Sequence, residues 1–184
     1  MAELIIGGAR SGKSAHAEKR ARDAEMAGQR IVYIATAEAR DEEMAARIAR
    51  HRARRPPHWA TKEITLHLAQ ALDEAAAPDV CIIVDCLTLW LTNLFFSGEA
   101  AARVDAGLEI DCPLLRGERQ ALEAALPQLP GRVILVSNEV GCGIVPAAPV
   151  ARAFADEQGR LNQRVAALCG SVTLMVAGLP LRVI

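Results

Sequence analysis

Residues 7–14 read Gly7-Gly8-Ala9-Arg10-Ser11-Gly12-Lys13-Ser14 and fill every fixed position of a phosphate-binding P-loop, G-x-x-x-x-G-K-[ST]. In such a loop the backbone N–H groups surround an anion, Lys13 reaches the terminal phosphates, and the Ser14 hydroxyl can bind Mg²⁺. A short apolar run at residues 4–6 precedes the loop, and a stretch of helix-forming residues follows it at 14–27. The motif requires this order of strand, loop and helix, so the sequence predicts a nucleotide site here.

Apolar runs alternate with helical stretches along the rest of the chain. Strands are expected at residues 3–6, 30–35, 80–84, 132–137, 172–177 and 181–184. Helices are expected at residues 14–27, 41–54, 65–76, 87–96, 114–126 and 149–168, the third capped by Thr65. Several strands are almost wholly apolar, which is typical of parallel strands covered on both faces. We therefore expect one α/β domain over residues 1–184, a P-loop NTPase with a mostly parallel, doubly wound, RecA-like sheet.

The composition narrows the class of function. Of the 184 residues, 52% are apolar and 23% are charged, which is typical of a folded domain with a sizeable core. The net charge of −1 argues against a general nucleic-acid binder. Residues 1–62 nevertheless carry 13 Lys and Arg against 8 Asp and Glu, so the positive charge is concentrated in the part with the P-loop. That distribution favours a polyphosphate ligand.

The cysteines and the apolar stretches indicate a cellular compartment. Five cysteines are scattered along the chain without a C-x-x-C pair, which is typical of a protein in a reducing environment. No signal peptide is visible ahead of the P-loop strand. The most apolar stretch, residues 81–96, is too short to span a bilayer and contains Asp85. We expect a cytoplasmic protein with no membrane span.

Asp85 follows the apolar run at residues 80–84 and is the second candidate for the nucleotide site. An acid at the end of a buried strand downstream of a P-loop is expected to hold Mg²⁺, directly or through water. The alternative is that Asp85 caps the helix at 87–96. The P-loop favours the metal role.

The most unusual segment is residues 41–59. On a helix, Met44, Ile48 and His51 share one face, and the apolar members of that face are expected to pack inward. Five arginines and no acid lie between residues 47 and 55. Arginines beside an imidazole favour its neutral, nucleophilic form. Two interpretations stay open at this point: a phosphate-contacting histidine, or an exposed charged helix with a passive one.

Three further segments are less decisive. Residues 137–146, Ser-Asn-Glu-Val-Gly-Cys-Gly-Ile-Val-Pro, follow an apolar strand and either line the site or form a tight turn. Gly159 lies inside the expected helix at 149–168, where glycine costs about 1 kcal/mol relative to alanine. That cost indicates close packing or a ligand. Residues 97–113 lack periodicity and are expected to form a surface excursion.

Together these segments resemble the family of bifunctional adenosylcobinamide kinases and adenosylcobinamide-phosphate guanylyltransferases. The resemblance rests on residues 7–14, 33–36, 41–59, Asp85, 92–94, 138–146 and 159–164, in this order over nearly the whole chain. It implies two reactions at one site. ATP or GTP phosphorylates adenosylcobinamide, and GTP then donates GMP to that phosphate, giving adenosyl-GDP-cobinamide. The family's covalent GMP–histidine intermediate would form on His51, and the family assembles as a homotrimer.

The resemblance also assigns binding residues. Besides the P-loop with its catalytic Lys13, it implies that the guanine nucleotide is bound by Ile34, Ala35, Thr36, Arg52, Ala53, Arg54, Arg55, Glu63 and Asp85. Glu63 is expected to accept hydrogen bonds from guanine N1 and N2. Two departures from relatives stand out. Arg50 replaces a second histidine found in some of them, which favours His51 as the nucleophile. Asp85 replaces a glutamate found in others.

Two other functions remain compatible with the motifs. A P-loop kinase for another small molecule would use His51 only as a phosphate ligand. A nucleotide switch or RecA-like ATPase would hydrolyse slowly and form no covalent nucleotide. Only the adenosylcobinamide enzyme predicts that GMP is retained on the protein.

Overall fold

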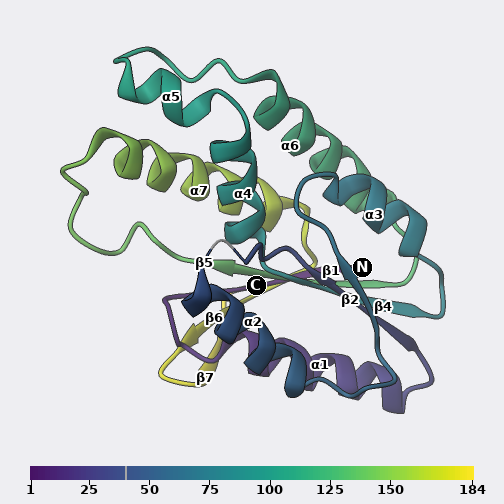
Figure 1. Ribbon diagram of the computed structural model, residues 1–184. Helices are drawn as coiled ribbons and strands as arrows, with labels where there is room; N and C mark the ends of the chain where they lie inside the picture. The colour runs from purple at the N-terminus through teal and green to yellow at the C-terminus, as the bar shows by residue number, and fades with distance from the viewer. Residues whose placement is uncertain (40) are drawn as a thin grey trace.

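The computed structural model describes residues 1–39 and 41–184, and for Arg47 it describes the backbone alone. The chain forms one seven-stranded sheet with helices on both faces (Figure 1). The strands are β1 (Ala2–Gly7), β2 (Arg30–Ala35), β3 (Ala60–Glu63), β4 (Val80–Asp85), β5 (Arg132–Asn138), β6 (Ser171–Val176) and β7 (Leu179–Arg182). The helices are α1 (Lys13–Met26), α2 (Glu42–Ala53), α3 (Leu68–Ala75), α4 (Leu87–Ser97), α5 (Ala100–Asp105), α6 (Pro113–Ala125) and α7 (Pro149–Leu168), with a 3₁₀ turn η1 (Leu126–Gln128).

The sheet has the order β3-β2-β4-β5-β1-β6-β7, and only β7 is antiparallel to its neighbour. β5 separates the P-loop strand β1 from β4, and parallel pairing sets Gly7 beside Asn138 and Asp85 beside Val136. The ends of β1, β4 and β5 therefore meet at one edge, the carboxyl edge, where doubly wound sheets bind ligands. This arrangement confirms the expected α/β, mostly parallel P-loop fold.

The two faces of the sheet are covered unequally. In Figure 1, α1 lies below the sheet, and α3, α4, α5, α6 and α7 lie above it. Ala17, Ala21 and Ala24 form the inner stripe of α1, and these small side chains let the helix approach the strands closely. The opposite layer is larger and contains the fully buried Trp90 and Phe95. The P-loop helix thus has one face of the sheet almost to itself.

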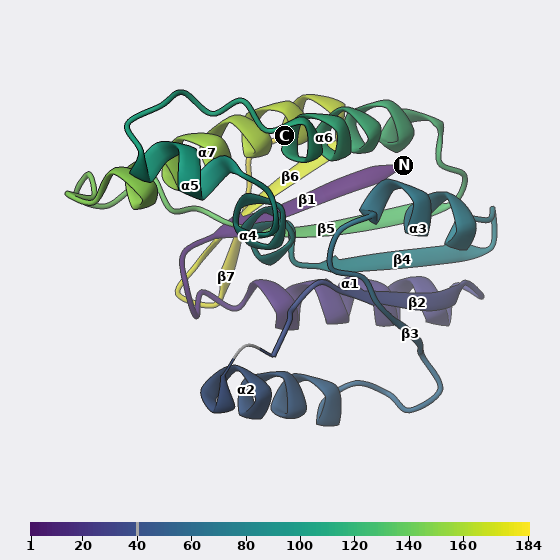
Figure 2. The ribbon, with the colours of Figure 1, turned by 45° about the horizontal axis from the view of Figure 1, so that its top comes forward.

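Helix α2 departs from the expected packing. It begins where Asp41 accepts a hydrogen bond from the backbone N–H of Met44, at 2.7 Å. None of its described side chains is buried, and Met44, Ile48 and His51 are all partly exposed. Figure 2 shows the helix at the bottom of the view, outside α1. The expectation that the apolar face packs into the core is therefore wrong, because α1 already occupies this face of the sheet.

Four smaller expectations also need correction. The short edge strand β3 was not expected, since its sequence, Ala-Thr-Lys-Glu, is polar. Helix α3 begins at Leu68 rather than at residue 65, so Thr65 is not its N-cap; His67 holds that position without a side-chain hydrogen bond. Residues 97–113 include the helix α5, which buries Ala100. The final strand lies at 179–182 rather than 181–184.

Within the described residues, no helix combines the length and the apolar character needed to cross a membrane. All five cysteines carry free thiols; only Cys142 is exposed.

Candidate active site

The P-loop runs from Gly7, the last residue of β1, to Gly12, the N-cap of α1. The Lys13 ammonium turns back and donates a hydrogen bond to the carbonyl oxygen of Gly8, at 2.6 Å. Gly12 has a φ of 96°, in the left-handed region that glycine tolerates. The first N–H groups of α1 and the Lys13 ammonium consequently point toward the space inside the loop, as an anion site requires.

The turn between β6 and β7 supports the P-loop from the side. The backbone N–H of Gly178 donates to the carbonyl oxygen of Ser11, at 3.0 Å. A β-carbon on Gly12 would come within 3.2 Å of the Gly178 Cα, and one on Gly7 within 2.5 Å of the Met175 carbonyl oxygen. The loop therefore needs glycine at both positions because β6 and its turn pack directly against it.

Asp85 ends β4 at the same edge and is held by Tyr33 of β2. The phenol O–H of Tyr33 donates to Asp85 Oδ2, at 2.6 Å. Burial and the Asp85 charge raise the pKa of Tyr33 well above its usual range, so the phenol keeps its proton. The Arg55 guanidinium stacks on the Tyr33 ring, with Cζ 3.5 Å from the ring centroid. This stack joins the segment that follows α2 to the strand that carries Asp85.

Ser14 and Asp85 fit the expected Mg²⁺ site chemically. Both offer oxygen ligands, and Tyr33 engages only one carboxylate oxygen of Asp85. The described residues contain no cluster of three or more His, Cys, Asp or Glu that could hold a metal. A site with few protein ligands suits Mg²⁺, which usually keeps several waters and binds substrate phosphates.

The residues expected at the end of β2 are largely internal. Ile34 and Thr36 are fully buried, and Ala35 is nearly so. The Thr36 hydroxyl donates to the Cys86 carbonyl oxygen at 2.7 Å and accepts from the Cys86 N–H at 2.9 Å. Asn93 of α4 donates to the Thr36 carbonyl oxygen, at 2.8 Å. These contacts fix the turn after Asp85, so Ile34 and Thr36 shape the site without presenting side chains to it.

The residues expected on and after α2 lie on its exposed side. His51 is partly exposed, and Arg52, Ala53 and Arg54 are exposed. The Arg52 Nη1 atom is 4.0 Å from Oε1 of Glu63. Glu63 ends β3 and is itself exposed. Because both side chains are exposed, the Arg52 guanidinium and the Glu63 carboxylate are accessible to a ligand.

Glu18 is a further candidate site residue, one that the sequence pattern does not single out. It lies one helical turn after Ser14 on α1, is 2% exposed, and its Oε1 atom has no hydrogen-bond partner. Burial raises the pKa of this carboxyl, and the charges of Arg54 and Arg22 oppose that effect only in part. The field of His51 also reaches Glu18. The segment at residues 47–55 contains five arginines and no acid. Glu18 of α1 therefore supplies a negative charge to this segment.

A second polar cluster lies on the other face of the sheet and joins two segments flagged in the sequence. The Ser137 hydroxyl donates to Asn162 Oδ1 at 2.7 Å, and the Gln158 amide donates to both side chains at 3.0 Å. The Asn162 amide donates to the carbonyl oxygen of Asn138 at 3.0 Å. All three side chains are buried. Helix α7 is thereby fastened to the carboxyl end of β5.

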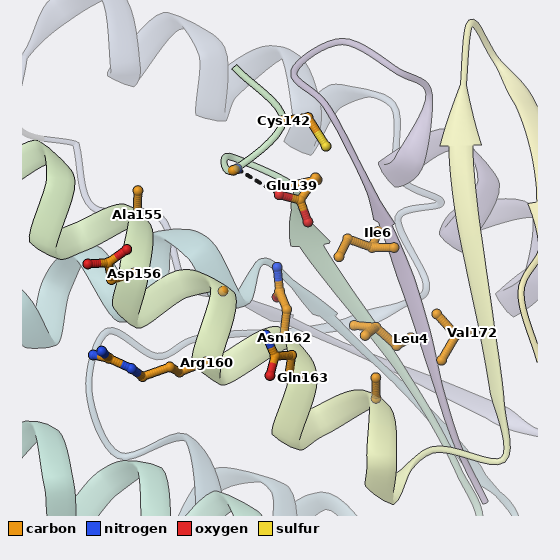
Figure 3. Close-up of a pocket in the computed structure, with 13 residues that line it drawn as sticks. Leu4, Ile6, Glu139, Cys142, Ala155, Asp156, Arg160, Asn162, Gln163 and Val172 are labelled. Atoms are coloured by element: carbon orange, nitrogen blue, oxygen red, sulfur yellow. Dashed lines mark hydrogen bonds between the residues drawn. The ribbon is translucent and has the colours of Figure 1, made fainter. Parts of the chain in front are cut away.

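A cavity of about 670 Å³ opens beside this cluster, between α7, β1 and β6 (Figure 3). Ile6 and Glu139 line its upper part, and the Glu139 N–H donates to the carbonyl oxygen of Gly7, at 2.9 Å. The cavity therefore adjoins the P-loop on the face of the sheet opposite α1.

Comparisons with known proteins agree with this arrangement. The family model described as cobinamide kinase / cobinamide phosphate guanyltransferase matches residues 3–183. A bifunctional adenosylcobalamin biosynthesis protein, CobP, from Pseudomonas aeruginosa is 50% identical over 181 residues, covering 98% of this chain and 96% of the relative. Proteins of the same description, both called CobU, come from Salmonella typhimurium (44% identical over 184 residues) and Escherichia coli (40% over 181). Each of those two alignments covers 98% of both chains.

Proposed function

Because this chain belongs to the family of bifunctional cobinamide kinases and cobinamide phosphate guanylyltransferases, we propose that it performs both reactions at the carboxyl edge described above. In the first, ATP or GTP phosphorylates adenosylcobinamide. In the second, GTP donates GMP to adenosylcobinamide phosphate through a GMP–His51 intermediate, giving adenosyl-GDP-cobinamide. One observation carries the proposal: the Arg55–Tyr33–Asp85 chain holds the segment after His51 to the end of β4, at the same edge of the sheet as the P-loop.

In the kinase step, the acceptor hydroxyl oxygen bonds to the γ-phosphorus while the bond between that phosphorus and the β–γ bridging oxygen breaks. The nucleoside diphosphate leaves, and the hydroxyl proton is lost to a base. The backbone N–H groups of residues 8–13 and the Lys13 ammonium bind and orient the phosphates. Ser14 and Asp85 would hold Mg²⁺, which offsets negative charge on the phosphoryl oxygens.

In the guanylyl step, an imidazole nitrogen of His51 bonds to the α-phosphorus of GTP, and pyrophosphate leaves. A phosphate oxygen of adenosylcobinamide phosphate then attacks the same phosphorus, the P–N bond breaks, and the imidazole is restored. Arg52, Arg54 and Arg55 are placed to offset the charge that develops on the phosphoryl oxygens. Ala53, the last residue of α2, is proposed to contact the nucleotide as part of the same segment.

The guanine base is proposed to bind near Glu63. Its exposed carboxylate can accept hydrogen bonds from the N1–H and N2–H groups of guanine. Ala35 ends β2 directly beside Glu63 in the sheet, and Ile34 and Thr36 support this strand from within. This interpretation explains why a polar edge strand, β3, belongs to the site.

Retention of labelled nucleotide tests the function. Protein incubated with GTP labelled at the α-phosphate should retain label that is labile to acid and stable to alkali, the behaviour of a phosphoramidate. His51→Ala should abolish the label and retain part of the kinase activity. His58→Ala is the matched control, because His58 lies close in sequence but pairs with Glu25, and it should label normally. Absence of label in the unaltered protein would refute the guanylyl step.

The assembly is proposed to be a homotrimer. The edge strand β7 and the residues after it expose large apolar side chains, Leu179, Leu181, Val183 and Ile184, each more than half exposed. Such a row on a sheet edge supports contact with another subunit. Light scattering should give three times the chain mass for the unaltered protein and a smaller mass for Leu181→Lys. The free thiols support a cytoplasmic location.

A further inference from the structure

The cavity between α7, β1 and β6 is lined by residues that directly adjoin the P-loop. Ile6, in its wall, directly precedes Gly7, and Glu139 donates its backbone N–H to the Gly7 carbonyl oxygen. Figure 3 shows Leu4, Ile6 and Val172 on one side of this space and the helix α7 on the other. A molecule in the cavity would therefore have one end beside the phosphate-binding loop.

The back of the cavity is rigid. Asn162 lines it and belongs to the buried cluster with Ser137 and Gln158. Each of these side chains makes at least two hydrogen bonds within the cluster or to Asn138. Only Gln158 Oε1 lacks a hydrogen-bond partner among the described residues of this cluster, and the bonds that are made hold neighbouring elements in one arrangement. The cavity is thus preformed, as small-molecule sites usually are.

Gly159 shows that the open space is not filled by the protein itself. It lies in the middle of α7 and lines the cavity, where a helix pays for glycine in stability. A β-carbon at this position would meet no atom of the described residues within 4 Å. Close packing inside the described chain therefore does not explain the glycine, and the space beside it is open to a bound molecule.

The lining has two kinds of surface. Leu4, Ile6 and Val172 are apolar, while Glu139, Asn162 and Gln163 offer hydrogen-bond donors and acceptors. The polar part of the lining also carries the charged side chains of Asp156 and Arg160. A corrin ring carries methyl groups and several amide side chains on its periphery, and one of these side chains ends in the hydroxyl that is phosphorylated. A preformed space lined by both amide-binding and apolar groups matches that chemistry. The helices that carry Lys13 and His51, α1 and α2, lie on the opposite face of the sheet, so the cavity is separate from the proposed nucleophile.

We propose that this cavity binds the edge of the corrinoid acceptor and aims its hydroxyl-bearing side chain at the P-loop, with Gly159 leaving room for the ring. The proposal rests on the proposed function, since it names where that enzyme's second substrate sits. At about 670 Å³ the space holds one side of a corrinoid rather than the whole molecule, so the rest of the ring extends outward.

Filling the cavity tests the proposal on the full-length enzyme. Gly159→Ala and Gly159→Leu add progressively larger side chains to α7 and should raise the KM for adenosylcobinamide in that order, by about tenfold or more for leucine. Formation of GMP–His51 from GTP, measured without corrinoid, should stay unchanged. Gly117→Leu is the matched control: Gly117 also lies inside a helix, α6, with no atom within 4 Å of a β-carbon in the described structure. Its KM should stay unchanged.

The outcomes separate this proposal from the proposed function. An unchanged KM for adenosylcobinamide in Gly159→Leu would overturn the corrinoid site while the labelling of His51 stands. A changed oligomer mass by light scattering in Gly159→Leu would overturn it too, because the cavity would then be a subunit contact. Absence of His51 labelling in the unaltered enzyme would instead overturn the proposed function itself.

Discussion

The two edges of the sheet differ in whether their buried polar side chains have hydrogen-bond partners. At the amino edge, Glu3 receives two hydrogen bonds from Arg20, at 3.0 Å each, and one from Arg132, at 2.6 Å. At the carboxyl edge, Glu18 Oε1, Arg55 Nε and Ser11 Oγ are buried without a hydrogen-bond partner in the described residues. Buried polar groups are almost always paired in a finished fold.

The difference separates stability from function. Burial pushes the pKa of Glu3 upward, but the hydrogen bonds from Arg20 and Arg132 outweigh it and leave this pKa below its usual value. Burial leaves the pKa of Glu18 raised. A carboxylate with a lowered pKa stabilises the fold at neutral pH, whereas one with a raised pKa destabilises it. Glu3 at the amino edge is therefore paired within the protein itself, whereas the carboxyl edge leaves buried polar atoms that a ligand could pair.

Removing a charge from the carboxyl edge should give the largest effect. Lys13→Ala takes away the ammonium that we propose compensates the phosphates in both reactions, so both rates should fall by about 10²- to 10³-fold. Steady-state assays of phosphoryl and guanylyl transfer measure this loss. Lys19→Ala, on the exposed side of the same helix, should be nearly neutral. A loss confined to one of the two reactions would mean that they do not share one phosphate site.

Breaking the paired amino edge should affect stability instead. Glu3→Gln leaves Arg20 and Arg132 without a carboxylate, and the free energy of unfolding at pH 7 should fall by about 2 kcal/mol. Because the folded pKa of Glu3 is lowered, its contribution is present above the unfolded pKa and is lost as pH falls through the folded pKa. Urea unfolding at several pH values measures both effects. Asp79→Asn, in the exposed pair with Arg30, should cost far less. Unaltered stability in Glu3→Gln would contradict the contrast between the edges.

Neutralising the Glu18 carboxylate, whose Oε1 has no hydrogen-bond partner and whose Oε2 lies 3.8 Å from an Arg22 nitrogen, should give the smallest effect, of opposite sign. Glu18→Gln keeps the side-chain shape, and the free energy of unfolding at pH 7 should rise by about 1 kcal/mol. Since the folded pKa is raised, the destabilisation by Glu18 is absent below the unfolded pKa and grows as pH rises toward the folded pKa. The variant should lack this dependence.

The same variant should label His51 more slowly, because Arg54 and His51 lose the negative charge that faces them. Thermal unfolding and the labelling rate are measured on one preparation. A variant that is both less stable and fully active would show that Glu18 belongs to the fold rather than to the site.

The sequence predicts the parts of this molecule that depend on local pattern. The P-loop has fixed spacing, and apolar runs mark the buried strands, so the fold and the shared edge of Lys13 and Asp85 follow from the sequence. β3 escapes prediction because an edge strand needs no apolar residues. The packing of α2 is mispredicted because periodicity shows which residues share a face but not what covers that face.

Contacts between residues far apart in the sequence could not be predicted from local pattern. Glu18 reads as an ordinary helix residue, and only the fold shows that its carboxyl is buried opposite Arg54. The stack of Arg55 on Tyr33 joins residues that belong to separate segments. A glutamate on the inner face of an otherwise alanine-lined helix is the one local signal that could have singled out Glu18.

The hydrogen bond from Gly178 to Ser11 has a consequence for how the protein is made. The P-loop comes first in the sequence, yet β1 lies between β5 and β6, and its loop rests on the turn after β6. Contacts between such distant segments form slowly during folding because a long loop must close first. The phosphate site therefore reaches its final shape among the last parts of the fold. The onset of nucleotide binding during refolding should accordingly coincide with completion of the sheet, rather than with formation of the strand and helix around the P-loop.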